Sequence, residues 1–300
     1  MSTNIELSKA RDFGEVISDS FLFIRENFKP LLKCFFIFCG FFMVATVVVS
    51  WMQQSKVIGA LNNFDPNSYS SGSNPFGAMS QYFGIEYVLV IVFAFLNGTA
   101  MTVTVISYMA VYKAKGNMTP TTEEVWGYIK FYFLTVFGSS ILIAILLAIA
   151  LVCCIIPFFY FFPIFALIFP IMIVENTGFG YAFSQSFKLI RDNFWVTFGA
   201  LIVVVIVVYI LAMIIVLPLS AANIGSLFLH RGKGMHLSPV LTLLTTALSE
   251  LSHVFYILPI VASVLCYFNL NELKEGTGLM DRINQLGANK ADTNLPAEEY

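Results

Sequence analysis

Glu250 and His253 are the two side chains whose types and spacing best suit acid–base chemistry in this sequence. On a helix, residues three positions apart share a face, so a proton could pass between the carboxylate and the imidazole. Both residues lie in an apolar stretch, and an acid at membrane depth costs at least ~2.5 kcal/mol on the insertion scale. Together with Asn97, which lies in another apolar stretch, the pair is a candidate transport or proton site.

The same polar groups also have a structural interpretation. The apolar stretch around the pair covers residues 237–268, which is 32 residues, whereas a hydrocarbon core needs only about 20. If residues 251–268 form the span, Glu250 lies at the outer interface and needs no special role. Asn97 stands among small and hydroxylated residues, which allow close packing between membrane helices as well as a path for a solute.

No other residues have the types and spacing of a reaction centre. The chain holds three histidines, and His230 and His236 lie beside cations that would oppose a metal ion. The five cysteines are an odd number and lack zinc-ligand spacing. No phosphate-binding glycine loop or hydrolase motif occurs. The sequence therefore predicts a protein that is not an enzyme and has no catalytic residues, bound metal or cofactor.

The composition indicates a membrane protein. Hydrophobic residues make up 58% of the chain and charged ones 11%, against roughly 25% charged residues in a soluble domain. The net charge of −2 argues against nucleic acid as a partner, because such binding needs a concentrated basic surface. Apolar runs long enough to cross a bilayer occur six times. The lipid bilayer is therefore the expected partner of the protein. The predicted spans are residues 31–52, 85–112, 134–155, 158–175, 195–218 and 242–268.

The distribution of lysine and arginine predicts the orientation. With both termini in the cytoplasm, the cytoplasmic segments hold 13 of these residues, and the outer segments hold three, Lys56, Arg231 and Lys233. The positive-inside rule favours this topology over its reverse. Residues 1–30 carry no cleavable signal pattern. We expect a multi-pass protein of the bacterial inner (cytoplasmic) membrane, with a cytoplasmic N-terminus and a cytoplasmic C-terminus.

A 16-residue segment occurs twice. FGEVISDSFLFIRENF at 13–28 and FGYAFSQSFKLIRDNF at 179–194 are identical at nine of sixteen positions. A fainter third copy covers residues 123–138. Each copy precedes two spans, so the chain divides into three parallel units of a surface helix and a transmembrane hairpin. In the third copy Trp126, Ile129, Lys130 and Phe133 take the places of Phe21, Ile24, Arg25 and Phe28.

The repeated segment is typical of an amphipathic helix that lies in the membrane interface. At 100° per residue its apolar side chains share one stripe and its charged ones lie opposite, which suits the interfacial plane. The predicted interfacial helices cover about 8–29, 121–133 and 178–193. The apolar stripe of the first copy comprises Ala10, Phe13, Ile17, Phe21, Ile24 and Phe28. The predicted interfacial anchors are Phe21, Arg25, Phe28, Trp126, Lys130, Phe187, Arg191 and Phe194.

These features predict an all-α fold, a polytopic membrane bundle of six transmembrane helices built from three repeats. A single membrane domain is expected over residues 1–286. A polar loop at 53–84 and a disordered cytoplasmic tail at 287–300 are the least apolar parts.

The arrangement resembles bacterial six-helix integral membrane proteins related to the membrane domain of glycerophosphoryl diester phosphodiesterases. The likeness rests on SDSFLFIRENF at 18–28 and SQSFKLIRDNF at 184–194, each of which precedes a hairpin, and it covers roughly residues 7–275. The resemblance implies the hairpin architecture. It implies no catalytic residue, because a soluble phosphodiesterase domain does not accompany these motifs.

Two functional hypotheses follow. In the first, the protein is a non-enzymatic scaffold or accessory subunit of a membrane complex, whose surface helices contact other membrane proteins. In the alternative, it is a small-solute or lipid transporter that uses the Glu250/His253 pair and the Asn97 region.

Overall fold

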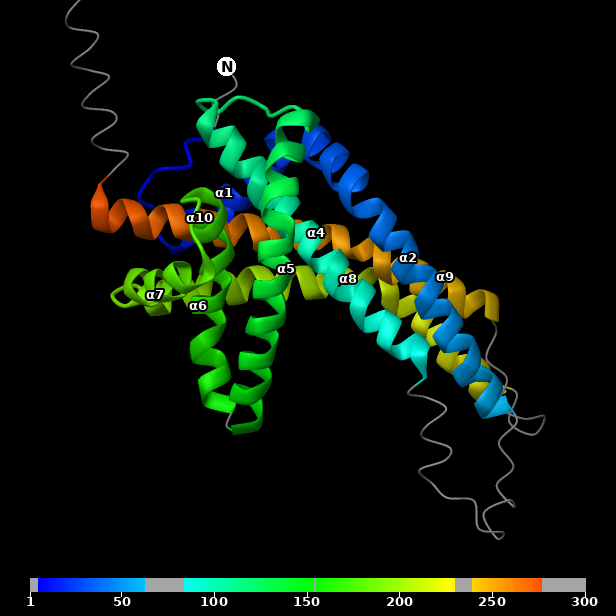
Figure 1. Ribbon diagram of the computed structural model, residues 1–300. Coiled ribbons are helices and arrows are strands. Elements are labelled where there is room, and N and C mark those ends of the chain that lie inside the picture. Colours follow the sequence, from blue (N-terminus) through cyan, green and yellow to red (C-terminus); the bar gives the residue numbers. More distant parts are fainter. Residues whose placement is uncertain (1–4, 63–83, 154, 230–238, 277–300) are drawn as a thin grey trace, which may run out of the picture.

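The computed structural model describes residues 5–62, 84–153, 155–229 and 239–276 (Figure 1). Within these ranges the chain is helical without strands, and six helical segments are long and apolar enough to cross a membrane. The prediction of an all-α polytopic bundle is confirmed. The six segments are Phe28–Val57, Ile85–Ala114, Thr122–Val152, Pro157–Val174, Phe194–Gly225 and Pro239–Glu275.

The spans pair as three hairpins, and two shorter helices, α1 and α7, lie at one end of them (Figure 1). We call this end the base and the opposite end the tip. The hairpins are α2 with α4, α5 with α6, and α8 with the composite span α9–η2–α10. The helices are α1 (Phe13–Glu26), α2 (Phe28–Asn62), α4 (Ile85–Ala114), α5 (Thr122–Cys153), α6 (Ile155–Val174), α7 (Phe179–Ile190), α8 (Phe194–Leu229), α9 (Pro239–Ser252), the short 3₁₀ helix η2 (His253–Tyr256) and α10 (Ile257–Glu275).

Helix α1 begins at a capping box formed by Asp12 and Glu15. The Asp12 carboxylate accepts from the backbone N–H of Glu15, and the Glu15 carboxylate accepts from the backbone N–H of Asp12. These bonds satisfy donors that a helix start leaves without partners. The ammonium of Lys9 donates to Glu15 as well, and it holds the pKa of that carboxyl below its usual range.

The side of α1 that faces the bundle differs from the predicted apolar stripe. Val16, Ser20 and Phe23 are buried, whereas Phe21 and Phe28 of the stripe are about half exposed. Helix α1 packs on α8 and α10, and the ring of Phe23 meets Tyr108 and Tyr112 of α4, so this side and not the stripe contacts the bundle. Phe21 and Phe28 instead line an apolar groove beside α8, η2 and α10, and their remaining exposed surface would have no cost in contact with hydrocarbon.

Helix α7 buries the positions that correspond to the buried face of α1. Ala182, Ser186 and Leu189 take the places of Val16, Ser20 and Phe23 in the repeated segment, and all three are buried. The two copies thus share a buried face as well as a sequence.

The predicted separate interfacial helix at 121–133 is not formed, because these residues are the first turns of α5, which continues without a break to Cys153. In the first copy Asn27 ends the surface helix, and its side-chain amide and its backbone N–H both donate to the carbonyl of Phe23. Asparagine competes with the helix for such backbone bonds. The third copy has Tyr132 in the place of Asn27, and the helix passes through it.

Candidate functional site

The sixth span changes its helix type at the predicted acid–base pair. Glu250 lies in the last turn of α9, and His253 is the first residue of η2. Their Oε2 and Nδ1 atoms are 3.0 Å apart, a hydrogen-bonding distance. A short 3₁₀ stretch inside a long helix often marks a hinge or a functional site.

A cavity of about 250 Å³ brings this pair together with Asn97. Thr46 of α2 and Tyr256 of η2 complete its polar lining, and the backbone and side chains of α4 form the remaining wall. Water takes roughly 30 Å³ per molecule in the liquid, so the cavity has room for several waters or a small chemical group. The structure therefore joins the three predicted transport residues, which come from two spans far apart in the sequence.

Asn97 supplies an unusual acceptor to this cavity. The residue is only 3% exposed, and its Oδ1 atom has no hydrogen-bond partner among the residues that the structure describes. A buried polar atom without a partner costs about 1–3 kcal/mol. The amide oxygen thus has an unused hydrogen-bonding capacity beside the cavity that its residue lines.

The depth of Asn97 can be measured along α4. Glu86, which pairs with Lys56 at the tip, precedes Asn97 by eleven residues, and Lys113 at the base follows it by sixteen. At 1.5 Å per residue these separations are roughly 16 Å and 24 Å. Since a hydrocarbon core is about 30 Å thick, Asn97 lies inside it.

Glu250 lies nearer to the tip than Asn97. It is one turn from Thr246, whose hydroxyl accepts from Gln54 at 2.9 Å, and Gln54 is two residues from Lys56. Helix α9 nevertheless extends eleven residues beyond Glu250 toward the tip. Glu250 therefore lies inside the sixth span, Pro239–Glu275, and not at its outer end. Its side chain is only 12% exposed.

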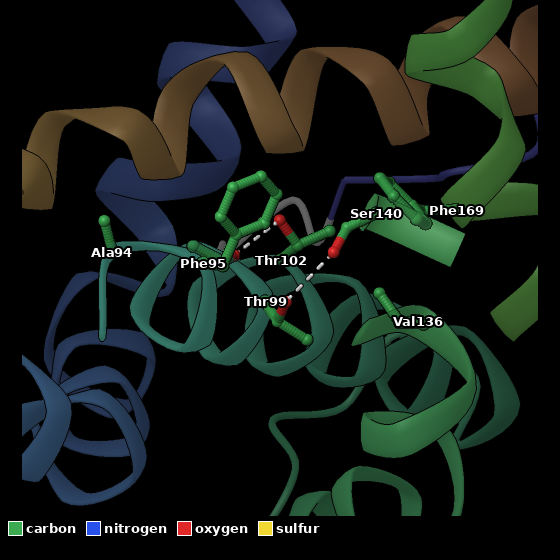
Figure 2. A pocket seen from close by; sticks show the side chains of 8 residues that line it. Ala94, Phe95, Thr99, Thr102, Val136, Ser140 and Phe169 are labelled. Carbon is green, nitrogen blue, oxygen red and sulfur yellow. Dashed lines mark hydrogen bonds between the residues drawn. The ribbon is translucent and has the colours of Figure 1, made fainter. Parts of the chain in front are cut away.

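A second cavity, of about 260 Å³, lies beside the first, between α4, α5 and α6 (Figure 2). Its hydroxyl groups already have partners. The Thr99 and Ser140 hydroxyls are 3.4 Å apart, and Thr102 donates to the carbonyl of Gly98 at 2.9 Å. Ala94 and Gly98 line both cavities.

Predicted interfacial anchors in two copies of the repeated segment contact the hairpin that precedes the copy in the sequence. Trp126 stacks on Phe38 of α2 with ring centroids 5.3 Å apart, and Phe187 meets Phe161 of α6 at 6.2 Å. In the first copy, which has no preceding hairpin in sequence, Phe21 lines an apolar groove with residues of α8, η2 and α10. The three copies therefore link the hairpins in a ring.

The remaining anchors lie around these contacts. Phe28 lines the same groove as Phe21, Phe194 stacks on Tyr160 at 5.2 Å, and the Lys130 ammonium lies 5.2 Å from the centre of the Trp126 ring. Arg25 and Arg191 are exposed at the base.

Arg11 is an organising residue that sequence reasoning missed. Its guanidinium is fully buried, donates to Asp19 at 2.8 Å, and donates to the backbone carbonyls of Glu6, Leu7 and Lys9. By helical periodicity Arg11, two residues before the first copy, falls on the same side as the charged residues of that copy, and no spacing in the sequence distinguishes it from the exposed charges nearby.

Three tyrosines form a second set of polar contacts at the base. Their hydroxyls donate to side-chain oxygens at the junctions between helices. The pairs are Tyr108 with Asn27 at 3.0 Å, Tyr132 with Asn176 at 2.7 Å, and Tyr267 with Glu175 at 2.9 Å.

Several residues and segments discussed from the sequence lie outside the described part of the chain. These are His230, His236 and Cys154, together with the cations Arg231 and Lys233, most of the 53–84 loop and the tail at 287–300. Among the residues that are described, no three histidine, cysteine or acidic side chains cluster as metal ligands would. Cys34, Cys39 and Cys266 are free thiols in the packed interior.

The architecture and the buried polar site define the class, a multi-pass membrane protein with six transmembrane helices. Comparisons with protein families, with characterised proteins and with solved structures find no match to this chain. The resemblance to the membrane domain of glycerophosphoryl diester phosphodiesterases therefore stays a prediction from the sequence.

Proposed function

We propose that this membrane protein is a non-enzymatic transporter that binds its substrate in the cavity between Asn97, Glu250 and His253. The observation that carries the proposal is made at Asn97, which lines the cavity of the acid–base pair and whose buried amide oxygen lacks a partner among the described side chains. An ionisable residue at membrane depth typically marks a substrate or ion pathway.

The chemistry of the cavity favours a ligand that donates hydrogen bonds. The Asn97 oxygen and the Glu250 carboxylate both accept, and His253 can hold or release a proton beside that carboxylate. A ligand with N–H or O–H groups would satisfy the Asn97 oxygen, which otherwise carries the cost of burial. Uptake of a proton by this pair from one side of the membrane and its release to the other side would then couple substrate movement to the proton gradient.

The break between α9 and α10 supports movement at this site. Glu250 is fixed to α9, whereas Tyr256 adjoins α10, so a change of angle at η2 would alter the cavity between them. Transporters commonly place substrate sites at interrupted membrane helices.

The orientation and the location are part of the proposal. Lys113, Lys188 and Lys274 lie at the base, and the positive-inside rule makes that end cytoplasmic. The protein would then lie in the inner membrane of a bacterium with both termini inside. The substrate cavity would be in the outer half of the bilayer.

Uptake into proteoliposomes tests the proposed function. Ethanolamine, glycerol, alanine and dodecylamine are first screened for an increase in the thermal unfolding temperature of the purified protein, because a ligand that binds the native state raises it. Proton-dependent uptake of the stabilising compound is then measured. We expect the Glu250→Gln variant to lose this uptake and the Glu86→Gln variant, changed outside the cavity, to keep it. Equal uptake by the wild type and Glu250→Gln contradicts the proposal.

A second candidate, a scaffold or accessory subunit, is favoured by one observation at the base. Phe21 and Trp126 remain 44% and 43% exposed although neighbouring side chains of their helices are packed. Such rings could contact another membrane protein. Co-purification in mild detergent that returns only this chain would count against that role, whereas a partner lost in the Phe21→Asp variant would support it.

A further inference from the structure

The two cavities on α4 form one groove. Ala94 and Gly98, one turn apart on α4, line both of them and are exposed. A Cβ atom added at Gly98 would meet nothing within 4 Å. We call Ala94 and Gly98 the floor of the groove, since the Cβ methyl of Ala94 is the only side-chain atom that these two residues place between its two ends.

The floor opens toward lipid. Ile91 and Val92, one turn closer to the tip on the same helix, are exposed apolar residues of a membrane span. Because Asn97 lies at hydrocarbon depth, the floor beside it does too. A molecule dissolved in the bilayer can therefore reach the groove sideways, without first entering water.

The end at Glu250 suits an ammonium group. The carboxylate and the Asn97 oxygen are acceptors, and an ammonium group has three N–H donors and no acceptor. The aromatic ring of Tyr256 also lines this end and can attract a cation through its face. His253 is the one basic side chain among the residues that line this cavity, and it is already directed to Glu250.

The other end of the groove suits a hydrocarbon chain. Phe95, Val136 and Phe169 supply apolar surface, as Figure 2 shows. The hydroxyls of Thr99 and Ser140 are within hydrogen-bonding distance of each other, so they leave little polarity for a ligand. The groove thus has an acceptor-rich end and an apolar end, which are joined at the floor.

We propose, building on the proposed function, that the substrate is an amphiphile with a protonated primary amine. Its ammonium head binds Glu250 and Asn97, and its alkyl chain crosses the Ala94–Gly98 floor into the cavity between α4, α5 and α6. Two sources have this chemistry, an aminophospholipid of the surrounding bilayer and a free long-chain amine.

Ligand binding to the detergent-purified protein tests this assignment, with affinity taken from the rise of the unfolding temperature with ligand concentration. The probes are dodecylamine, ethanolamine, which lacks the chain, and dodecanol, which lacks the charge. We expect dodecylamine to bind at least tenfold more tightly than either of the others. Partitioning into micelles is the same for all protein variants, so comparisons between variants report on the groove.

Two substitutions separate the ends of the groove. We expect Gly98→Leu to weaken dodecylamine at least tenfold and ethanolamine much less, because the leucine closes the path to the apolar end, and Glu250→Gln to weaken both amines. The matched control is Gly127→Leu, at an exposed helical glycine with equally open space and away from the groove, which should bind as the wild type does.

The outcomes separate this inference from the proposed function. Ethanolamine binding as tightly as dodecylamine would overturn the amphiphile and keep the site, whereas equal binding of dodecanol would overturn the ammonium head. If the Glu250→Gln variant binds every probe with unchanged affinity, both proposals are contradicted. Unchanged dodecylamine affinity in Gly98→Leu would refute the groove.

A last measurement distinguishes the two sources of the amine. The protein is placed in nanodiscs that contain equal amounts of phosphatidylethanolamine and phosphatidylglycerol. The lipid that stays bound after release from the nanodiscs is identified by native mass spectrometry. Enrichment of phosphatidylethanolamine in the wild type, lost in Glu250→Gln, supports the phospholipid. Tight dodecylamine binding without that enrichment supports the free amine.

Discussion

The backbone N–H of Arg11 donates a hydrogen bond of 2.7 Å to the side-chain oxygen of Asn269, which lies 258 positions later in the chain. This bond ties the segment before α1 to the base of α10. Because α1 also packs on α8 and α10, the start of the chain closes the ring of hairpins against the last one. Ile5 and Leu7, in the same N-terminal segment, are buried beneath it.

We predict that Arg11→Met destabilises the protein strongly. The substitution leaves the Asp19 carboxylate and several backbone carbonyls without their donor, and removing one partner of a buried ion pair costs about 3–5 kcal/mol. Denaturant unfolding in detergent measures the loss. Lys9→Met is the control, because the Lys9–Glu15 pair is exposed and such pairs contribute less than about 1 kcal/mol. Equal stability of the two variants would show that Arg11 does not organise the base.

Phe21 and Phe23, two of the three phenylalanines of α1, are predicted to contribute very differently to stability. Phe23 is fully buried against the rings of Tyr108 and Tyr112, so Phe23→Ala should cost about 3–5 kcal/mol of unfolding free energy. Phe21→Ala should cost less than about 1 kcal/mol, because the ring is half exposed. Thermal unfolding of both variants shows which side of α1 packs on the bundle. A larger loss of stability in Phe21→Ala than in Phe23→Ala would support the predicted apolar stripe instead.

Tyr108→Phe is predicted to destabilise the base without changing its packing volume. The tyrosine hydroxyl donates to Asn27, and its removal leaves a buried acceptor, which costs about 1–3 kcal/mol. Combining Tyr108→Phe with Asn27→Ala should cost less than the sum of the two single changes, since both remove the same bond. Additive losses in this double-mutant cycle would mean that the hydrogen bond contributes nothing.

The sequence predicts the six spans because long apolar runs leave few alternatives, but it does not predict which side of α1 is buried. In a water-soluble protein the apolar stripe faces the core. At a membrane interface Phe21 can face lipid at no cost, so its apolar character does not distinguish lipid from protein contact. The buried face is instead marked by Ser20 and Ser186. From the helical period alone these small polar residues would be expected to be exposed to water, but both are buried.

Part of the candidate site is likewise visible in the sequence. The contact of Glu250 with His253 follows from their spacing on one helix. Their approach to Asn97 does not, because it depends on how α9 packs against α2 and α4. The role of Gly98 as a floor between two cavities depends on the positions of α5 and α6, and no local pattern encodes it.

Labelling of single cysteines tests the proposed orientation. In a background without the native cysteines, Met118→Cys and Tyr181→Cys place thiols at exposed positions of the base, and Lys56→Cys places one at the tip. A membrane-impermeant maleimide added to intact cells should label only Lys56→Cys, and the two base positions should react after the cells are opened. Labelling of Met118→Cys or Tyr181→Cys from outside would reverse the topology and move the cavity to the inner half of the bilayer.

Asn97→Leu is predicted to make the protein more stable and less active at once. The leucine has a similar size and removes a buried oxygen that lacks a partner among the described residues, so the unfolding free energy should stay constant or rise by about 1 kcal/mol. The same change removes an acceptor that the substrate needs, and proton-dependent uptake should fall at least tenfold. A functional site commonly carries such a cost in stability. Thermal unfolding and uptake measured on the same preparation separate this outcome from misfolding, because a misfolded variant would lose stability together with activity. If Asn97→Leu instead destabilises the protein by several kcal/mol, the amide must have a structural partner, and its availability to a substrate is refuted.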